Sequence, residues 1–362
     1  MGCARSIWNA KVEEERYYRT YARKYCTIGT YAPIDQTTSQ FKSKELSPWL
    51  SECPSQILRN SAVNWYQTYQ KFMSGKCGRP KRKPKTDKGS IYLTREVFRF
   101  DHCDDGNVRL FIGTKTNNIG YLSFKAHGKF EIPNSLYVRK ERGHYYVSFC
   151  YEQGQPDRKL STNEEHLAFL QGATREYLEE HTMGVDRGVA IPVCAGEQTY
   201  DFTHSQKKNM SKADRYIKRL QRKLARQQKG SNRRAKTKHR IAVHHAKKAN
   251  IRNDFAHKTS RLLVDSSAKI IVFEALRTAR MTRRPKAKQD EQGRFISNKA
   301  KQKAGLNKSI LNVGWHVIET YTYYKAYSSS KAVFKIPAPT TSQECAKCGH
   351  THPDNRKTQA LF

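Results

Sequence analysis

The stretch His181-Thr-Met-Gly-Val-Asp186-Arg-Gly188 decides the fold, because it is typical of a short strand that ends in a carboxylate and a glycine. The residues that follow, Val189-Ala-Ile-Pro-Val-Cys194, predict a second strand, so that Asp186 lies near the turn of a hairpin. Further along, Lys269-Ile-Ile-Val-Phe-Glu274 is an apolar run that ends in a second carboxylate. Such a run is typical of a strand buried on both faces. These strands predict an α/β domain with a central sheet.

The two strand-end acids have a chemical role in one class of enzyme. A carboxylate at the end of a buried strand is costly unless a positive partner compensates its charge. Nucleases of the RNase H type hold two Mg²⁺ ions about 3.5–4 Å apart between acids on neighbouring strands, and carboxylate oxygens suit Mg²⁺. We therefore predict that Asp186 and Glu274 are catalytic Mg²⁺ ligands. The alternative for either acid alone is a surface carboxylate near the end of a strand.

The most basic stretch of the chain lies between these strands. Residues 207–252 contain 18 Lys and Arg and a single acid, Asp214. Apolar residues from Ile217 to Leu224 fall on one helical stripe, and Gly230-Ser-Asn breaks the run, which predicts a helical hairpin inserted into the nuclease domain. The run could be a solvated face, but its single sign favours nucleic-acid contact. The cations expected to make this contact are Lys218, Arg219, Arg222, Lys223, Arg226, Arg233 and Arg234.

The first part of the chain predicts a helical segment and a basic linker. Within residues 1–75, apolar residues recur at helical spacing over 54–73 and indicate a core-facing helix. Residues 76–89 form the linker, centred on Gly78-Arg-Pro-Lys-Arg-Lys-Pro-Lys85. A Gly-Arg-Pro sequence between lysines can enter a narrow minor groove; the alternative is a solvated linker. On the first interpretation the nucleic-acid contacts are Arg79, Lys81, Arg82 and Lys83.

Residues 90–155 change to short runs of β type separated by turn residues. The expected strands cover 90–98, 108–112, 120–124, 129–132, 136–138 and 145–151. Several short strands at close spacing predict a small β-barrel. An oligonucleotide-binding barrel would suit the charge of the chain, and other small barrels fit the pattern equally well.

The remainder of the chain completes the nuclease domain, which we place at 156–340. After Glu274 a basic loop is expected, then one helix over Leu306–Tyr327 and a third strand over Lys331–Ile336. In the last segment, 341–362, Cys345 and Cys348 have the spacing of Zn²⁺ ligands.

Composition restricts the partners. The 362 residues carry 68 Lys and Arg against 32 Asp and Glu, a net charge of +36, which indicates a polyanionic ligand. A membrane role is not expected, because no run of about 18 apolar residues occurs and no signal peptide is evident near Met1. Seven of the nine cysteines are scattered and only Cys345 and Cys348 have metal-ligand spacing, so the cysteines do not form a disulfide pattern and favour a reducing cytoplasm.

Several motifs together resemble the TnpB family of bacterial transposons, whose members are related to type V CRISPR effectors. The matching segments are Gly184-Val-Asp186-Arg-Gly188, Val272-Phe-Glu274-Ala-Leu276, Ala304-Gly-Leu-Asn-Lys-Ser-Ile-Leu-Asn-Val-Gly-Trp315, the Cys345–His350 region with Asn355–Gln359, and the basic turn Gly78-Arg-Pro80. Each motif alone is weak, but the combination is specific and covers most of the chain.

The resemblance implies an RNA-guided DNA endonuclease with a RuvC-like (RNase H-like) domain. Its implied partners are a guide RNA and target double-stranded DNA, with no protein partner required. Asp186 and Glu274 would bind Mg²⁺, the hairpin 207–252 would line the guide–target duplex, and Cys345 and Cys348 would belong to a zinc ribbon. The implied location is the prokaryotic cytoplasm, at the nucleoid when DNA is bound.

The sequence departs from the family pattern at both ends. Family members have an extra strand before the segment that opens this chain, and beyond Phe362 a second Cys-x-x-Cys pair and a third acid. We therefore expect a chain truncated at both ends, with a partial zinc ribbon whose site is loosely held, that binds nucleic acid but does not cut it. Two alternatives stay open: an RNA-guided DNA-binding protein without nuclease activity, and a DNA transposase acting without guide RNA.

Overall fold

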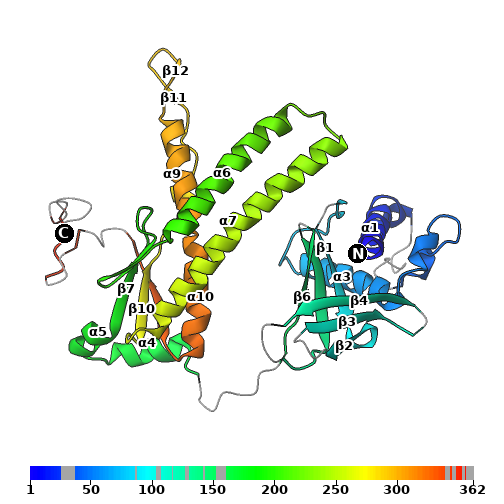
Figure 1. Cartoon of the computed structure of the whole chain (residues 1–362), viewed down its shortest axis with the longest axis horizontal. Coiled ribbons are helices and arrows are strands. Elements are labelled where there is room, and N and C mark those ends of the chain that lie inside the picture. Colours follow the sequence, from blue (N-terminus) through cyan, green and yellow to red (C-terminus); the bar gives the residue numbers. More distant parts are fainter. Residues whose placement is uncertain are drawn as a thin grey trace. The chain divides into compact units, whose positions relative to one another are not determined.

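The computed structural model describes residues 1–25, 37–85, 88–102, 107–115, 117–126, 130–141, 143–151, 160–338, 343–344, 348–352 and 355. The chain divides into two compact units, Met1–Gly154 and Gln155–Phe362, each with its own hydrophobic core (Figure 1).

The helices of the first unit are α1 (Gly2–Tyr17), which continues through a π-helical turn into the short α2 (Arg23–Tyr25), and α3 (Ser55–Met73). The predicted helix over 54–73 is confirmed as α3. Its apolar stripe is buried, with Ile57, Leu58 and Trp65 all at 2% exposure or less. Residues 37–54 are not helical throughout, because they contain only two 3₁₀ turns, Ser39–Phe41 and Pro48–Leu50.

Two antiparallel sheets complete the first unit. One has the order β1-β5-β6, with β1 at Gly89–Thr94, β5 at Ser135–Glu141 and β6 at His144–Ser148. The other has the order β2-β3-β4, with β2 at Phe98–His102, β3 at Asn107–Gly113 and β4 at Asn118–Lys125. Leu93, Leu110 and Leu136 join the two sheets and the helices in one buried cluster. The predicted small barrel is not established by these two sheets and stays a prediction.

Two strand predictions in this region are wrong. The run 90–98 is not one strand, because a 3₁₀ turn at Arg95–Val97 carries the chain from β1 in one sheet to β2 in the other. Residues 130–132 are not a strand; Pro133 follows them and cannot donate to a ladder. Phe130 instead packs among Phe100, Phe124 and Phe149, so its apolar side chain serves the core without strand pairing.

The second unit is built on a five-stranded sheet of order β13-β10-β7-β8-β9. Its strands are β7 (Thr182–Asp186), β8 (Val193–Ala195), β9 (Gln198–Tyr200), β10 (Ile270–Glu274) and β13 (Ala332–Ile336). Strands β7, β10 and β13 are parallel, whereas β8 and β9 pair antiparallel in a meander. Ile270 and Ile271 point to opposite faces of β10 and are both buried, at 5% and 0% exposure, as expected for an apolar strand covered on both faces.

The predicted hairpin is present as two long helices, α6 (His204–Ala225) and α7 (Asn232–Asp265), which lie side by side (Figure 1). Thr203 and Gln206 form a capping box that starts α6, and the Ser231 side chain caps α7. Gly230 in the turn has φ +89°, a conformation that favours glycine. In the described part of the chain, no helix is long and apolar enough to cross a membrane.

The segments around the sheet are helical with one small ribbon. They comprise α4 (Asn163–Gln171), α5 (Arg175–His181), α8 (Thr278–Met281), β11 (Lys288–Gln289), β12 (Phe295–Ile296), α9 (Ala300–Val313) and α10 (Trp315–Ser328). The prediction of one helix over 306–327 is wrong, because Gly314 separates α9 from α10. Its φ of +80° ends the first helix, and a right-handed helix cannot continue through it.

Candidate functional site

The structure brings Asp186 and Glu274 to the same edge of the sheet. Strands β7 and β10 are parallel, and Phe273 lies opposite Val185, so the next residues along the two strands are the two acids. Neighbouring strands lie about 4.8 Å apart, and residues in register point to the same face. Asp186 is exposed and Glu274 half-buried. Two carboxylates from separate parts of the chain therefore lie at the C-terminal ends of neighbouring strands.

The turn after Asp186 depends on Gly188. A Cβ atom at this position would come 2.6 Å from the carbonyl oxygen of Ile191. The carbonyl oxygen of Gly188 accepts a 3.1 Å hydrogen bond from Trp315 Nε1 on α10. The backbone N–H of Arg187 donates to Asp186 Oδ1 at 2.7 Å, which orients the carboxylate. The glycine noted in the sequence thus sets the backbone that presents the first acid.

Arg187 and Glu319 belong to this site, and the sequence interpretation missed both. The Arg187 guanidinium is buried, with Nη1 2.7 Å from Glu319 Oε2, and it donates to the backbone carbonyl oxygen of Glu274. Glu319, on α10, also pairs with Lys335 of β13. The sequence features that could have indicated these two residues are the position of Arg187 directly after the strand-end acid and the position of Glu319 next to the apolar Ile318, which is buried.

Glu319 should make folding sensitive to acid. Burial raises the pKa of Glu319, but hydrogen bonds and charges from Lys335 and Arg187 outweigh burial and hold this pKa below its usual value. A carboxyl with a depressed folded-state pKa adds stability above its unfolded pKa of about 4.3 and loses it as pH falls through the folded value. We therefore expect the unfolding temperature of the second unit to drop as pH falls below about 4, and less steeply in Glu319→Gln. Calorimetry across this pH range measures it; identical slopes for the two proteins would contradict the assignment.

Other metal sites can be assessed only within the described residues. Among them, no group of three or more His, Cys, Asp or Glu is placed to hold a metal ion. Cys348 is exposed, and Cys345 lies outside the described residues. The Zn²⁺ prediction for these cysteines therefore stays a prediction.

The hairpin carries a cationic face as predicted from the sequence. Along α6, Ala213 and Ile217 are buried, and the basic residues at 218, 219, 222 and 223 lie on the opposite side, as helical spacing requires, with Arg226 at the C-cap. In the described part of the chain, six of the predicted contacts have exposed side chains without an ion pair or hydrogen bond to protein: Lys218, Arg219, Arg222, Lys223, Arg226 and Arg233. Arg234 differs, because it closes the hairpin turn by donating to the carbonyl oxygens of Gln227, at 2.9 Å, and Leu224.

The basic linker is held against α1. Trp8 Nε1 donates to the carbonyl oxygen of Lys81 at 2.9 Å, and the Asn9 side chain bonds both the N–H and the carbonyl oxygen of Lys83. Three of the four predicted contacts have partners within the first unit: Arg79 pairs with Glu15 at 2.9 Å, Arg82 with Glu13 at 3.2 Å, and the Lys83 ammonium lies 3.4 Å from the centre of the Trp8 ring. Residues 79–83 of the linker therefore lie along α1, and their nucleic-acid role stays a prediction.

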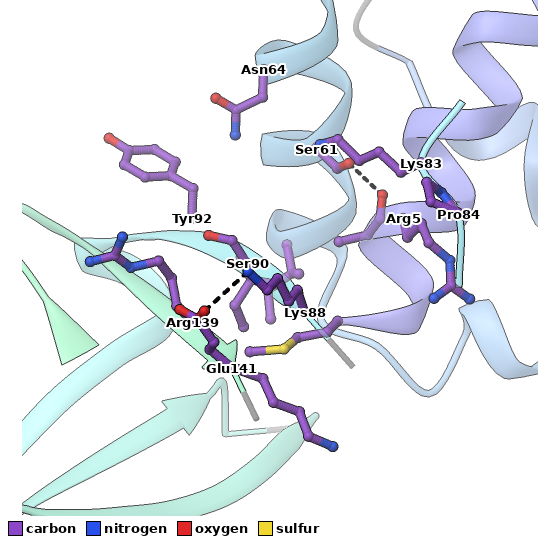
Figure 2. Close-up of a pocket in the computed structure, with 16 residues that line it drawn as sticks. Arg5, Ser61, Asn64, Lys83, Pro84, Lys88, Ser90, Tyr92, Arg139 and Glu141 are labelled. Atoms are coloured by element: carbon purple, nitrogen blue, oxygen red, sulfur yellow. Dashed lines mark hydrogen bonds and ion pairs between the residues drawn. The ribbon is translucent and has the colours of Figure 1, made fainter. Parts of the chain in front are cut away.

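A cavity of about 560 Å³ in the first unit adds to the cationic surface (Figure 2). Its lining comes from α1, α3, the end of the linker, β1 and β5. The charged and polar side chains around it include Arg5, Lys83, Lys88, Arg139, Lys140, Glu141, Asn64 and Tyr92. Glu141 pairs with Lys88 at 3.1 Å, so the other cations that line the cavity give it a net positive charge. Sequence patterns could not reveal this cavity, because its residues come from four separate segments.

Comparisons with known proteins agree with the motifs. Residues 148–284, which include both acids and the whole hairpin, match the OrfB_IS605 family model, described as "Probable transposase". The chain is 27% identical over its whole length to "Putative RNA-guided DNA endonuclease InsQ" of Escherichia coli (strain K12), and covers 81% of that protein. A Streptomyces pristinaespiralis protein with the same description, apart from the name InsQ, is 23% identical over 75% of this chain and 61% of its own length.

The fold is similar to that of a solved effector. The cryo-EM structure of Cas12f1 with sgRNA and target DNA matches 97% of this chain and 74% of that protein, with a TM-score of 0.52 and 11% sequence identity. At this identity the likeness concerns the mixed α/β fold. The family model and the relatives agree with the resemblance to the TnpB family, and the solved structure adds the mixed α/β fold.

Proposed function

We propose that this protein is an RNA-guided DNA endonuclease of the TnpB type, with a RuvC-like site at the ends of β7 and β10. The observation that carries the proposal is the parallel pairing of these strands, which places Asp186 and Glu274 side by side. An RNase H-like domain needs acids on adjacent strands of a mixed sheet, and the sheet of the second unit meets that need. The names of the relatives support the guided activity.

The donor chemistry of the two acids fits Mg²⁺, because carboxylate oxygens are the hard ligands that this ion prefers. When bound, a pair of such ions would activate a water molecule and stabilise the leaving oxygen of a phosphodiester. Within the chain, Asp186 and Glu274 would hold the ions, and the Arg187 N–H would keep one oxygen of Asp186 in place.

The proposed partners are a guide RNA and target DNA. In RNA-guided recognition, base pairing reads sequence and the protein contacts backbones. The unpaired cations on α6 have the chemistry for phosphate contact. We also propose that the two sheets of the first unit form the small oligonucleotide-binding barrel, with the cationic cavity beside it.

Guide-dependent DNA binding without cleavage is a second candidate. It is favoured by one observation: the described residues contain no group of three or more potential metal ligands. Two dications about 4 Å apart repel each other strongly, and two carboxylates offset that repulsion only in part.

For the tail we propose that Cys345 and Cys348 are two ligands of a Zn²⁺ site. A structural Zn²⁺ site takes four ligands, so these two thiolates need further donors. Zinc content of the purified full chain, compared with a Cys348→Ala variant, tests this assignment; equal zinc in both proteins would remove it.

One experiment separates the candidate activities. RNA that co-purifies with the full chain is sequenced, and a DNA duplex matching it is offered with Mg²⁺, beside a scrambled duplex. We expect binding to the matched duplex only, with loss of binding after ribonuclease treatment. Matched controls are Asp186→Asn and Glu274→Gln, which keep the size of each side chain.

The outcomes distinguish the proposals. Cleavage of the matched duplex that both variants lose supports the endonuclease. Matched binding without cleavage supports the second candidate. Binding and cutting that ignore the RNA sequence would exclude both and favour a transposase acting without a guide.

A further inference from the structure

Arg187 is a buried charge directly behind the two strand-end acids. Its side chain is 2% exposed. The guanidinium carbon lies 5.1 Å from the centre of the Phe273 ring, and Nε has no hydrogen-bond partner. Burying a cation is costly, so its position is explained by the groups it touches. These are Glu319 and the backbone carbonyl oxygen of Glu274.

The guanidinium lies on the opposite face of the sheet from the acids. Side chains alternate along a strand, and Arg187 shares the face of Val185 and Phe273, whereas Asp186 and Glu274 share the other. Arg187 therefore does not reach the reacting side. It acts through the main chain, since its backbone follows Asp186 directly and its side chain holds Glu274.

We propose that Arg187 is a positioning residue that sets the spacing of the Asp186 and Glu274 carboxylates, an inference that rests on the proposed metal site. The covalent link to Asp186 and the hydrogen bond to the main chain of Glu274 make one rigid connection between the two strand ends.

Glu319 keeps this connection in place. It accepts from Arg187 and also pairs with Lys335, so α10 and β13 both support the guanidinium. Arginine suits this position because its planar fork donates in two directions at once, to the carboxylate and to the carbonyl. A lysine side chain is shorter and ends in a single ammonium, so it cannot bond both the carboxylate and the carbonyl oxygen in the same geometry.

The test measures Mn²⁺ binding to the full chain by electron paramagnetic resonance, because Mn²⁺ takes the same oxygen ligands as Mg²⁺ and the readout does not need cleavage. Asp186→Asn defines the fraction of binding that belongs to the site. Arg187→Lys and Glu319→Gln are expected to weaken that fraction by about 10–100-fold, as loss of partners that orient ligands does. Val264→Ala, a buried change elsewhere in the same core, controls for general destabilisation.

Each outcome addresses one claim. Weaker Mn²⁺ binding in Arg187→Lys and Glu319→Gln, with Val264→Ala unchanged, supports the positioning role. Normal affinity in both variants, or an equal loss in Val264→Ala, overturns it while leaving the metal site intact. If Asp186→Asn itself binds Mn²⁺ normally, the metal site and the proposed function fail first. If Arg187→Lys does not fold, Glu319→Gln decides, since it keeps the arginine.

Discussion

Alanine at Arg219, Arg222, Lys223 and Arg226 together is expected to flatten the salt dependence of nucleic-acid binding. These side chains are exposed on one face of α6 and at its C-cap, Arg226, and have no partner among the described residues. Each bound phosphate releases counterions, so the slope of log affinity against log salt should fall by about one for each phosphate that the variant no longer binds, or about four in all. Fluorescence anisotropy of a labelled RNA–DNA hybrid of arbitrary sequence, over a series of KCl concentrations, measures this slope.

A matched control removes the same formal charge from cations that already have acidic partners. These are Arg175 with Glu179, Lys207 with Asp201, Lys258 with Asp254, and Arg261 with Asp265. Their replacement by alanine should change the slope much less, because paired cations release fewer counterions on binding. An unchanged slope in the α6 variant would remove the hairpin from the interface. Equal changes in both variants would show that only net charge matters.

Asp214→Ala is expected to destabilise the second unit by about 3–5 kcal/mol, because it leaves Lys248 as a buried cation without its anion. Lys248 is 5% exposed and lies 2.7 Å from Asp214 Oδ1 and 3.1 Å from Asn312 Oδ1. Asp214 also pairs with Lys308 at 2.9 Å. This one carboxylate therefore ties α6 to α7 and α9. Hydrogen exchange of α6 and α7 peptides, followed by mass spectrometry, measures the loss without requiring two-state unfolding of the chain.

Two further variants separate the buried charge from lost packing. Lys308→Ala should cost less than about 1 kcal/mol, because half-exposed ion pairs contribute little. The double variant Asp214→Ala with Lys248→Met should recover most of the lost protection, since no buried charge remains. A double variant as unstable as Asp214→Ala would mean that Lys248 is not the source of the destabilisation.

The sequence by itself determined the elements that carry the chemistry. The apolar run that ends in Glu274 predicted β10, because a strand buried on both faces must be apolar wherever it lies, and the short run that ends in Asp186 and a glycine predicted β7. The basic stretch predicted α6 and α7 with their break at Gly230, because helical spacing and a glycine turn are local features. Motif combinations predicted the family, and the relatives agree.

Only the tertiary structure decided which charged side chains form ion pairs or hydrogen bonds within the protein. Arg187 and Glu319 are 132 residues apart, so no local sequence pattern indicates that they form an ion pair. Nothing near Arg187 in the sequence distinguishes it from the exposed cations of the chain. Three arginines lie in basic segments like those of the exposed cations, yet they bind acids or carbonyl oxygens of the protein itself: Arg79, Arg82 and Arg234. The register that sets Asp186 beside Glu274 also follows from strand pairing. Periodicity reports which side of an element is buried, whereas ion pairs and strand neighbours depend on which distant element covers it.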